Sequence, residues 1–260
     1  MASSLFSLQG ETALVTGGTR GIGASVALGL AEAGADMILI QRDLKATETK
    51  EAIEALGRKV SIYTADLADQ SSVSKIVPNV LADGHKITIL VTCAGIQRRH
   101  KCHEFPDSDF NEVIQVNLNS VFTLCRDVGA HMLDLPVSST TGRRGSIINF
   151  ASLLSFQGGM FVPAYAASKG AVSQMTKTFS NEWTSKGITI NCIAPGYIAT
   201  DMNTALLADK EREKSISDRI PAGRWGVSDD FKGTAVYLSS KASGYVSGHT
   251  LVVDGGWMGR

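Results

Sequence analysis

Thr12-Ala13-Leu14-Val15-Thr16-Gly17-Gly18-Thr19-Arg20-Gly21-Ile22-Gly23 is the stretch of sequence that decides the fold. Its apolar start predicts a buried strand over 12–16, and the residues after it predict a helix over 24–33 that is closed by Gly34. Glycines between a strand and a helix permit a tight turn and a close approach to a pyrophosphate, which the free amides of the helix N-terminus can bind. The same pattern also fits a plain strand-to-helix turn, so the rest of the chain must decide.

The pattern of apolar strands separated by helices continues along the whole chain. We expect strands at 12–16, 36–41, 60–64, 87–91, 145–150, 188–193 and 250–253. We expect helices at 24–33, 47–56, 69–83 with an interruption at Pro78, 109–135 with a break near 117–120, 163–184 and 228–240. This order predicts an α/β fold, a Rossmann-type doubly wound parallel sheet of about seven strands in a single domain over residues 1–260. A more polar segment, about 197–226, predicts a mobile flap that could close over a substrate.

Composition excludes several classes of function. The 260 residues are 43% hydrophobic, and the 25 basic side chains equal the 25 acidic ones, so neither nucleic acid nor a membrane surface is an expected partner. The first ten residues lack a basic leader and a long apolar run, which argues against a signal peptide or an anchor. Cys93, Cys102, Cys125 and Cys192 are widely spaced, which predicts reduced thiols, no metal site and a cytoplasmic protein.

The carboxyl ends of the expected strands should form the ligand crevice. Ala94 and Gly95 follow the fourth strand. Asp66 follows the third and could contact adenine, or could equally be a helix cap or turn residue. At the end of the second strand, a carboxylate would bind ribose hydroxyls and an arginine would accept a 2′-phosphate. Gln41 and Arg42 stand there, so both NAD and NADP stay open as cofactors.

A second stretch, which contains side chains suited to catalysis, runs from Ser152 to Lys169. It contains a hydroxyl at Ser152, and a phenol and an amine at Tyr165 and Lys169, whose spacing places them on one face of a helix. A neighbouring ammonium favours the phenolate, so we expect Lys169 to lower the pKa of Tyr165 and to permit proton exchange with a substrate. The basic cluster at 97–101 could meet an anionic substrate or could simply be solvated.

Taken together, these motifs resemble the short-chain dehydrogenases/reductases over nearly the whole chain. The matching features are Thr16-Gly17-x-x-x-Gly21-x-Gly23, Ala94-Gly95, Asn117, Ser152, Tyr165-x-x-x-Lys169, Pro195-Gly196 and Asp254-Gly255-Gly256. The resemblance implies an oxidoreductase that transfers hydride between NAD or NADP and a secondary alcohol or ketone. It also implies a small-molecule substrate and a homo-oligomer, a dimer or tetramer formed through the two long helices.

The resemblance also implies roles for individual residues. The catalytic tetrad would be Asn117, Ser152, Tyr165 and Lys169. The cofactor would contact Gly17, Thr19, Arg20, Gly21, Ile22, Gly23, Gln41, Arg42, Asp66, Leu67, Ala94, Gly95, Tyr165, Lys169, Pro195, Gly196, Ile198 and Thr200. The substrate would contact Arg98, Arg99, Ser152, Leu154, Gln157, Tyr197 and Met202. Where the family most often has Asn-Asn-Ala-Gly, this chain has Thr92-Cys93-Ala94-Gly95, which leaves the contacts of the first two side chains open.

Within the family, the segments at 98–99, 154–159, 194–197, 219–226 and 254–257 are similar to the 2-deoxy-D-gluconate 3-dehydrogenase branch, which acts on keto-deoxy sugar acids. The alternatives are a dehydrogenase of another alcohol, of the polyol, gluconate, 3-oxoacyl or steroid type, and a cofactor-sensing protein without catalysis. The first alternative would differ in the flap and in the loop at 97–101. The second is disfavoured by the complete set of Asn, Ser, Tyr and Lys.

Overall fold

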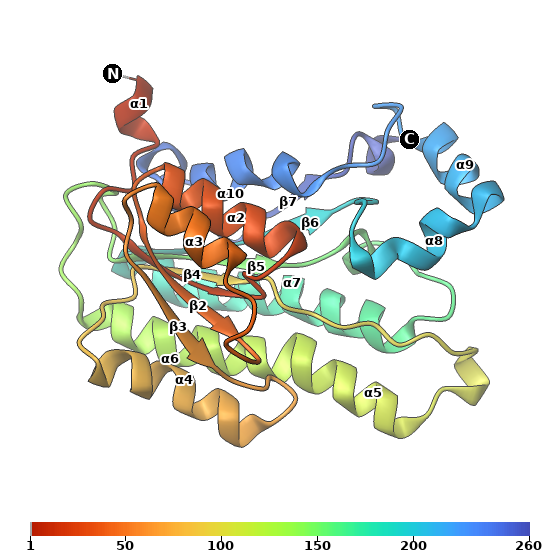
Figure 1. The fold of residues 1–260 in the computed structure, drawn as a ribbon, viewed down its shortest axis with the longest axis horizontal. Coiled ribbons are helices and arrows are strands. Elements are labelled where there is room, and N and C mark those ends of the chain that lie inside the picture. The colour runs from red at the N-terminus through yellow and green to blue at the C-terminus, as the bar shows by residue number, and fades with distance from the viewer. Residues whose placement is uncertain (1) are drawn as a thin grey trace.

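The computed structural model describes the backbone of residues 2–260 and the side chains of residues 4–204 and 206–260. Over this range the strands form one parallel sheet in the order β3-β2-β1-β4-β5-β6-β7 (Figure 1). The strands are β1 (Thr12–Thr16), β2 (Asp36–Gln41), β3 (Val60–Thr64), β4 (Ile89–Thr92), β5 (Gly145–Phe150), β6 (Ile188–Pro195) and β7 (Thr250–Val253). The predicted doubly wound Rossmann-type sheet is therefore confirmed.

Helices cover both faces of the sheet (Figure 1). One face carries α2 (Gly21–Glu32), α3 (Glu48–Ala55) and α10 (Lys232–Ser239), and the other carries α4 (Gln70–Ala82), α6 (Ser120–Asp134) and α7 (Pro163–Trp183). The remaining helices are α1 (Ala2–Leu5), α5 (Asp107–Ile114), α8 (Thr204–Ala208) and α9 (Lys210–Arg219). Both α8 and α9 stand beyond the sheet, on the side to which β6 points.

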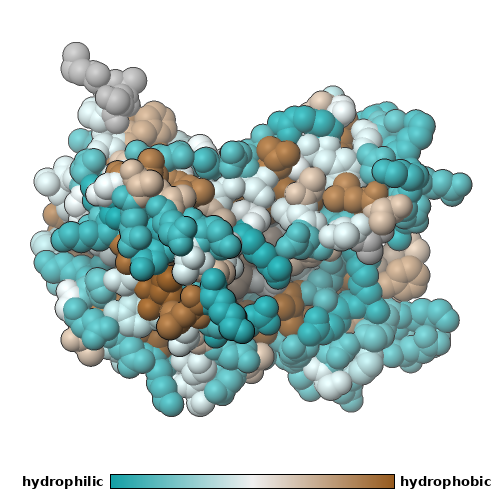
Figure 2. Space-filling model, in the orientation of Figure 1, coloured by the Kyte–Doolittle hydropathy of each residue, from teal (hydrophilic) through white to brown (hydrophobic). Residues whose placement is uncertain are grey.

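Side chains alternate between the two faces of the sheet along each strand, so the protein has a separate apolar core on each face. On β1, Leu14 packs with the side chains of α4, α6 and α7, whereas Ala13 and Val15 pack with those of α2, α3 and α10. Successive side chains of a strand point to opposite faces, and a sheet buried on both faces therefore needs continuous apolar strands. Hydrophilic side chains cover most of the face shown in Figure 2. Among the described residues, no helix has both the length and the apolar character needed to cross a membrane.

Two local expectations are corrected. The helix over Pro78 is not interrupted: α4 continues through it, because the ring is exposed while Val73, Val77 and Val80 on the other face are buried. The break near Asn117 is a π-helical turn, Gln115–Asn119, which joins α5 to α6 without ending the helical path. The polar segment predicted as a mobile flap contains two helices that the sequence did not predict, α8 and α9. Leu206 and Ile216 anchor this segment to a small apolar cluster with Trp225 and Trp257.

The order of the strands places the switch in winding direction between β1 and β4. Strands β2 and β3 follow on one side of β1, and β4 to β7 on the other. In open sheets of this kind, ligands bind beyond the carboxyl ends of the strands at that switch. The glycine turn after β1 and the Ala94-Gly95 turn after β4 both lie there.

Candidate active site

The glycine turn is closely packed against the neighbouring strand end. Gly17 has a φ of 72°, and a Cβ there would stand 2.9 Å from the Cα of Ala94. A Cβ on Gly23 would collide with the carbonyl oxygen of Gly17. Only glycine therefore fits at these positions, because the turn folds back on the first residues of α2 and touches the end of β4.

The N-terminus of α2 is free to bind an anion. Arg20 is the N-cap residue, its backbone is extended, and its side chain makes no capping hydrogen bond. A Cβ built on Gly21 would meet no atom closer than 3.7 Å, which is the Cγ2 of Thr200. Uncapped amides, the helix dipole and open space at the turn together fit a dinucleotide pyrophosphate. Thr19 and Ile22 belong to the same turn.

At the end of β2, Gln41 and Arg42 have different surroundings. The Gln41 side chain is buried, and its Nε2 donates to the backbone oxygen of Asp43 at 2.6 Å, while its Oε1 has no partner among the described residues. A buried acceptor without a donor is costly, and a ribose hydroxyl could supply that donor. Arg42 is exposed and forms no ion pair with any described residue, which leaves its guanidinium free for a phosphate.

Asp66 is a turn residue in the structure. Its Oδ1 accepts from the backbone N–H of Ala68 at 2.9 Å, and Asp69 is the residue that caps α4 by accepting from Ser71. Leu67 is half-buried against the core. The Asp66 carboxylate lies beyond β3 and is exposed, so an adenine contact remains open to it.

Ser152 and Tyr165 meet at the carboxyl end of β5. Ser152 begins a short 3-10 turn, Leu153–Ser155, and its Oγ accepts from the N–H of Leu154 at 3.2 Å. Tyr165 lies in the first turn of α7, and its phenol hydrogen-bonds with Ser152. Burial raises the pKa of Tyr165, and the hydrogen bond with Ser152 opposes that rise.

Lys169 is buried one helical turn after Tyr165. Its Nζ donates to the carbonyl oxygen of Phe150 at 2.7 Å and lies 5.7 Å from the centre of the Tyr165 ring. Burial lowers the pKa of Lys169 to about 8. The expected lowering of the Tyr165 pKa by Lys169 is not found, because both groups are desolvated and the loss of water raises the phenol pKa more than its neighbours lower it.

Asn117 is fully buried and joins the end of β4 to α7. Its Oδ1 accepts from the N–H of Ile96 at 2.9 Å, and its Nδ2 donates to the oxygen of Ile96 at 2.9 Å and to Ser168 at 3.2 Å. A Cβ built on Gly95 would stand 3.3 Å from Asn117 and 3.7 Å from the Nζ of Lys169. The two cofactor-side glycine turns and the four predicted catalytic residues therefore occupy one region.

Ser155 and Cys93 also belong to this region, although the motifs did not identify them as site residues. Ser155 donates to the carbonyl oxygen of Lys169 at 2.7 Å and accepts from the N–H of Ser152 at 3.3 Å. The Ser-x-x-Ser spacing of a capping box is the sequence signal for it. Burial raises the pKa of the Cys93 thiol to about 12, which keeps it neutral beside Lys169.

The segment after β6 returns over the glycine turn. Gly196 packs against Asp254, where a Cβ would stand 2.6 Å from its Cα, and Ile198 is buried and bridges to Gly226. Thr200 lies opposite Gly21, and Asp201 pairs with Arg20 at 3.1 Å. The strand end at Pro195 is thus placed to face the same crevice.

The loop between Ser152 and Tyr165 carries several of the predicted substrate contacts. Phe161 has a φ of 68°, the only positive φ of a non-glycine residue in the described chain, and such strain is frequent at functional sites. Its carbonyl accepts from the N–H of His100 at 3.1 Å, which ties the basic loop to this one. Leu154 and Gln157 are half-buried there, and Met202 is exposed on the flap.

The basic cluster itself is largely paired. Arg98 binds Glu112 at 2.7 Å, His100 binds Asp109 at 2.6 Å, and Lys101 lies 3.5 Å from Glu104. Arg99 is exposed and has no partner among the described residues. The sequence could not predict these pairs, because their carboxylates come from the following helical region. Arg98 and Arg99 stay predicted substrate contacts, with Arg99 as the free cation.

Tyr197 lies among aromatic rings on the flap side. Its ring centre is 5.4 Å from that of Trp225 and 4.6 Å from that of Trp257. It therefore connects the segment after β6 to the C-terminal turn, and it lines a cavity together with residues of α9.

Comparison with known proteins gives a consistent picture. A family model described as short chain dehydrogenase matches residues 11–211. The 2-dehydro-3-deoxy-D-gluconate 5-dehydrogenase of Pseudoalteromonas atlantica is 50% identical over 257 residues, which cover 98% of this chain and 98% of that protein. The enzyme of the same name from Bacillus subtilis is 48% identical over 98% of this chain and 97% of its own length.

Solved structures agree with these relatives. A gluconate 5-dehydrogenase from Burkholderia cenocepacia, in complex with NADP and tartrate, is 38% identical with a TM-score of 0.92 and full coverage of both chains. A protein from Agrobacterium tumefaciens, proposed to be a 2-deoxy-D-gluconate 3-dehydrogenase and bound to NADP, is 44% identical with a TM-score of 0.88, and the match covers 98% of this chain and 99% of that one.

Proposed function

The chain belongs to the short-chain dehydrogenase family, and from this premise we propose that it oxidises the C5 hydroxyl of 2-dehydro-3-deoxy-D-gluconate, or reduces the corresponding ketone, with NAD or NADP. It is an NAD(P)-dependent oxidoreductase. The resemblance suggested 2-deoxy-D-gluconate or a related keto-deoxy uronate. The curated relatives are named for a keto-deoxy sugar acid, so we prefer this substrate to 2-deoxy-D-gluconate.

The observation that carries the proposal is the meeting of Ser152, Tyr165, Lys169 and Asn117 beside the glycine turns. The nicotinamide cofactor supplies or accepts the hydride. Ser152 donates a hydrogen bond to the reacting oxygen, and Tyr165 gives that oxygen a proton or takes one from it. In the oxidative direction Tyr165 receives the proton of the hydroxyl.

Lys169 and Asn117 support this exchange. The pKa of Lys169, about 8, lies close to neutral, so its amine can pass a proton between Tyr165 and solvent. Asn117 holds the 94–96 turn and, through Ser168, the helix that carries Tyr165. As the resemblance implies, Asn117 would also keep a water in line with Lys169.

The residues at the end of β2 favour acceptance of NADP. Arg42 is free of carboxylate partners in the described chain, and no acidic side chain stands at Gln41 to repel a 2′-phosphate. The orphaned Oε1 of Gln41 can accept from a ribose hydroxyl, so NAD is accepted as well. We expect activity with both cofactors.

A matrix of substrates and cofactors tests the proposal. 2-Dehydro-3-deoxy-D-gluconate, D-gluconate, 2-deoxy-D-gluconate, a neutral polyol and a 3-oxoacyl thioester are each assayed with NAD or NADP, in the direction each requires, at the nicotinamide absorbance band. We expect the highest kcat/KM for the keto-deoxy sugar acid. A higher kcat/KM for gluconate or for a neutral substrate would reject the assignment.

Tyr165→Phe is the matched control for the chemistry. It should lower turnover by about 10²- to 10⁴-fold, the usual contribution of a general acid or base, while cofactor binding measured by nicotinamide fluorescence stays nearly unchanged. Retained turnover in this variant would remove Tyr165 from the reaction.

A further inference from the structure

A cavity of about 490 Å³ lies between the loop that joins Ser152 to Tyr165 and the flap. Met160 of that loop lines one side of it, and Tyr197 and Trp257 line another. The remaining wall comes from α9, which stands beyond the carboxyl end of β6 (Figure 1). A cavity placed here is open to whatever part of a substrate extends away from the reacting carbon.

One face of α9 points into this cavity. Arg212, Ser215, Ile216 and Arg219 line it, and their spacing of i, i+3, i+4 and i+7 is that of a single helical stripe. Ile216 is buried and fixes the stripe against Leu206 and Trp225. The helix therefore presents two cations and a hydroxyl to the same space.

Both arginines are available for a ligand. Neither guanidinium forms an ion pair or a hydrogen bond with any residue whose side chain the structure describes. The carbon at the centre of the Arg219 guanidinium lies 4.0 Å from the centre of the Trp257 ring, so the ring supports one face of the group. A stacked guanidinium keeps its edge N–H groups free, and these match the two oxygens of a carboxylate.

The charge in the cavity favours an anion. Glu211 also lines it, and together with the two arginines leaves one net positive charge. The basic loop at 97–101 offers less, because the guanidinium of Arg98 is already paired with Glu112 at 2.7 Å. An anion that enters the site therefore finds unpaired cations mainly on α9 and at Arg99.

The cavity adjoins the reacting groups. Leu153, which directly follows Ser152, is buried in the same apolar cluster as Ile216 and Trp257. Tyr197 packs on this cluster and directly follows the Pro195-Gly196 turn on the nicotinamide side. A linear sugar acid whose carbon 5 lies at Ser152 and Tyr165 can extend its carboxylate along this wall.

We propose that Arg219 and Arg212 bind the carboxylate of the sugar-acid substrate and so select acids over neutral sugars. This inference rests on the proposed function for its choice of ligand. The stacking on Trp257 positions Arg219 for a paired contact, and Arg212, about two turns earlier on the same face of α9, adds charge without a fixed geometry.

Steady-state kinetics tests the proposal. KM and kcat for 2-dehydro-3-deoxy-D-gluconate are measured at saturating NADP in Arg219→Gln, Arg212→Gln and Arg219→Lys. We expect KM to rise about 10- to 100-fold in Arg219→Gln, as for a lost charge-assisted hydrogen-bonded pair, and less in Arg212→Gln, with kcat changed only slightly. The KM of Arg219→Lys should lie between those of the wild type and Arg219→Gln, since lysine keeps the charge but loses the planar contact. Lys210→Gln is the matched control, because Lys210 is an exposed cation of the same helix that does not line the cavity, and this variant should leave KM near the wild-type value.

A second measurement separates this inference from the proposed function. Calorimetric titration with the same sugar acid in the presence of NADP measures binding without turnover. If the wild-type protein binds the sugar acid but does not turn it over, and Arg219→Gln binds it more weakly, the proposed reaction is rejected and the anion site is kept. Wild-type turnover with an unchanged KM in both Arg219→Gln and Arg212→Gln would overturn the anion site, as would an equal rise of KM in Lys210→Gln. Thermal melting of each variant shows whether the fold is intact, and Arg212→Gln, which stacks on no ring, keeps the test valid if Arg219→Gln unfolds.

Discussion

Lys169, a proposed catalytic residue, shows how the burial of an amine can cost stability. It is an amine with 4% of its surface exposed, and its hydrogen bond to the oxygen of Phe150 replaces only part of the lost water. Burial therefore lowers its pKa from 10.5 to about 8. An exposed lysine would not suffer this penalty, but its pKa would lie too far from neutral for proton exchange.

We predict that Lys169→Met changes the pH dependence of stability. The folded state holds this proton less tightly than the unfolded chain, so the wild-type free energy of unfolding gains from Lys169 as the pH rises from about 8 to 10.5. Met lacks this gain. The free energy of unfolding of the wild type minus that of Lys169→Met should therefore increase by roughly 3 kcal/mol between pH 7 and pH 10.5, at about 1.36 kcal/mol per pKa unit.

Urea unfolding across this pH range measures the shift. Lys177→Met is the control, because Lys177 is an exposed lysine on the same helix and should show no comparable trend. A pH-independent difference between Lys169→Met and the wild type would mean that the lysine pKa is not lowered.

The sequence could propose site residues where a motif indicated the chemistry. It could not predict the pKa of a side chain where burial sets that pKa. The order of Asn117, Ser152, Tyr165 and Lys169 along the chain was enough to propose these four side chains, which the structure brings into one region. The rise in the Tyr165 pKa was not visible, because it depends on how much water the folded site excludes. Such desolvation is set by contacts that are distant in the sequence.

Ser155 connects two elements of the site, the 3-10 turn after β5 and the helix α7. Its hydroxyl binds the carbonyl oxygen of Lys169 and the backbone N–H of Ser152. The hydroxyl therefore links the turn that carries Ser152 to the helix that carries Tyr165 and Lys169, the other proposed reacting groups. We regard it as a positioning residue.

We predict that Ser155→Ala lowers kcat about tenfold, because a less well oriented site should raise the activation free energy by about 1.4 kcal/mol, which corresponds to that factor. KM for the cofactor should stay nearly constant, and Ser155→Thr should restore most of the rate. Ser173→Ala is the control, because Ser173 on the same helix bonds Thr250 at 2.9 Å away from the tetrad. An equal fall in kcat for both alanine variants, explained by lower melting temperatures, would leave Ser155 with a purely structural role.

At the scale of elements, the sequence predicted the strands better than the helices of the flap. The expected bounds of β1, β2, β3, β5 and β7 agree with the structure, because buried parallel strands are continuous apolar runs. Helix α9 was missed, since its exposed polar surface hides the single buried Ile216. The uninterrupted path through Pro78 was missed because tertiary packing outweighs the local cost of proline.

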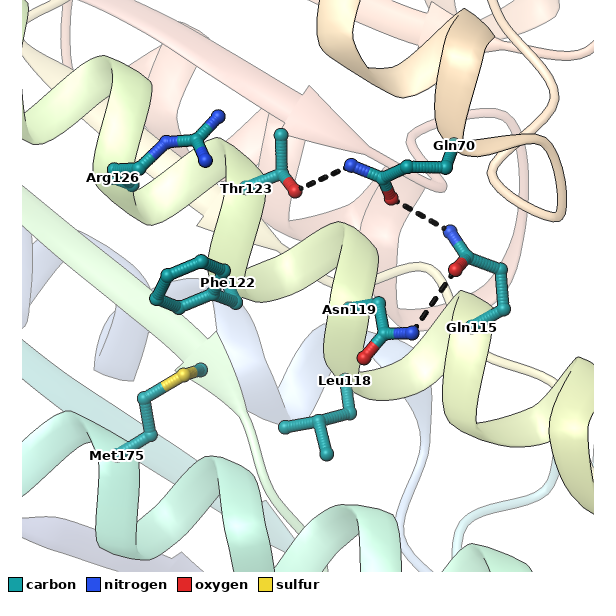
Figure 3. Close-up of a pocket in the computed structure, with 8 residues that line it drawn as sticks. All are labelled: Gln70, Gln115, Leu118, Asn119, Phe122, Thr123, Arg126 and Met175. Carbon is teal, nitrogen blue, oxygen red and sulfur yellow. Dashed lines mark hydrogen bonds between the residues drawn. The ribbon is translucent and has the colours of Figure 1, made fainter.

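At the scale of the whole molecule, the surface of α6 and α7 carries apolar groups without a cover in the described chain. Phe122 is 42% exposed, and its ring stacks on that of Phe179 at 6.1 Å, which stacks on Trp183 at 4.5 Å. Leu118, Phe122 and Met175 line a cavity of about 430 Å³ beside a chain of amide hydrogen bonds from Gln70 to Gln115 and Asn119 (Figure 3).

We propose that this surface is where copies of the chain associate, as the resemblance to the family implied. The net charge is zero, so no long-range repulsion opposes association. An exposed aromatic ring beside a hollow lined by Leu118 and Met175 is a suitable contact for a symmetric partner, in which each copy offers the same surface.

Phe122→Glu should therefore reduce the mass of the protein in solution from a dimer or tetramer to a smaller species, because each symmetric contact would bury two new carboxylates. The fold should tolerate the change, since Arg126 lies one helical turn away with its guanidinium carbon 5.7 Å from the Phe122 ring centre and can pair with the glutamate. Light scattering at micromolar concentration measures the mass. Val137→Glu, an equally drastic change at a 57% exposed position in the loop after α6, is the control and should keep the wild-type mass. A wild-type monomer, or an oligomer that survives Phe122→Glu, would place the contact elsewhere or remove it, and an equal loss in both variants would show that added charge and not this surface controls association.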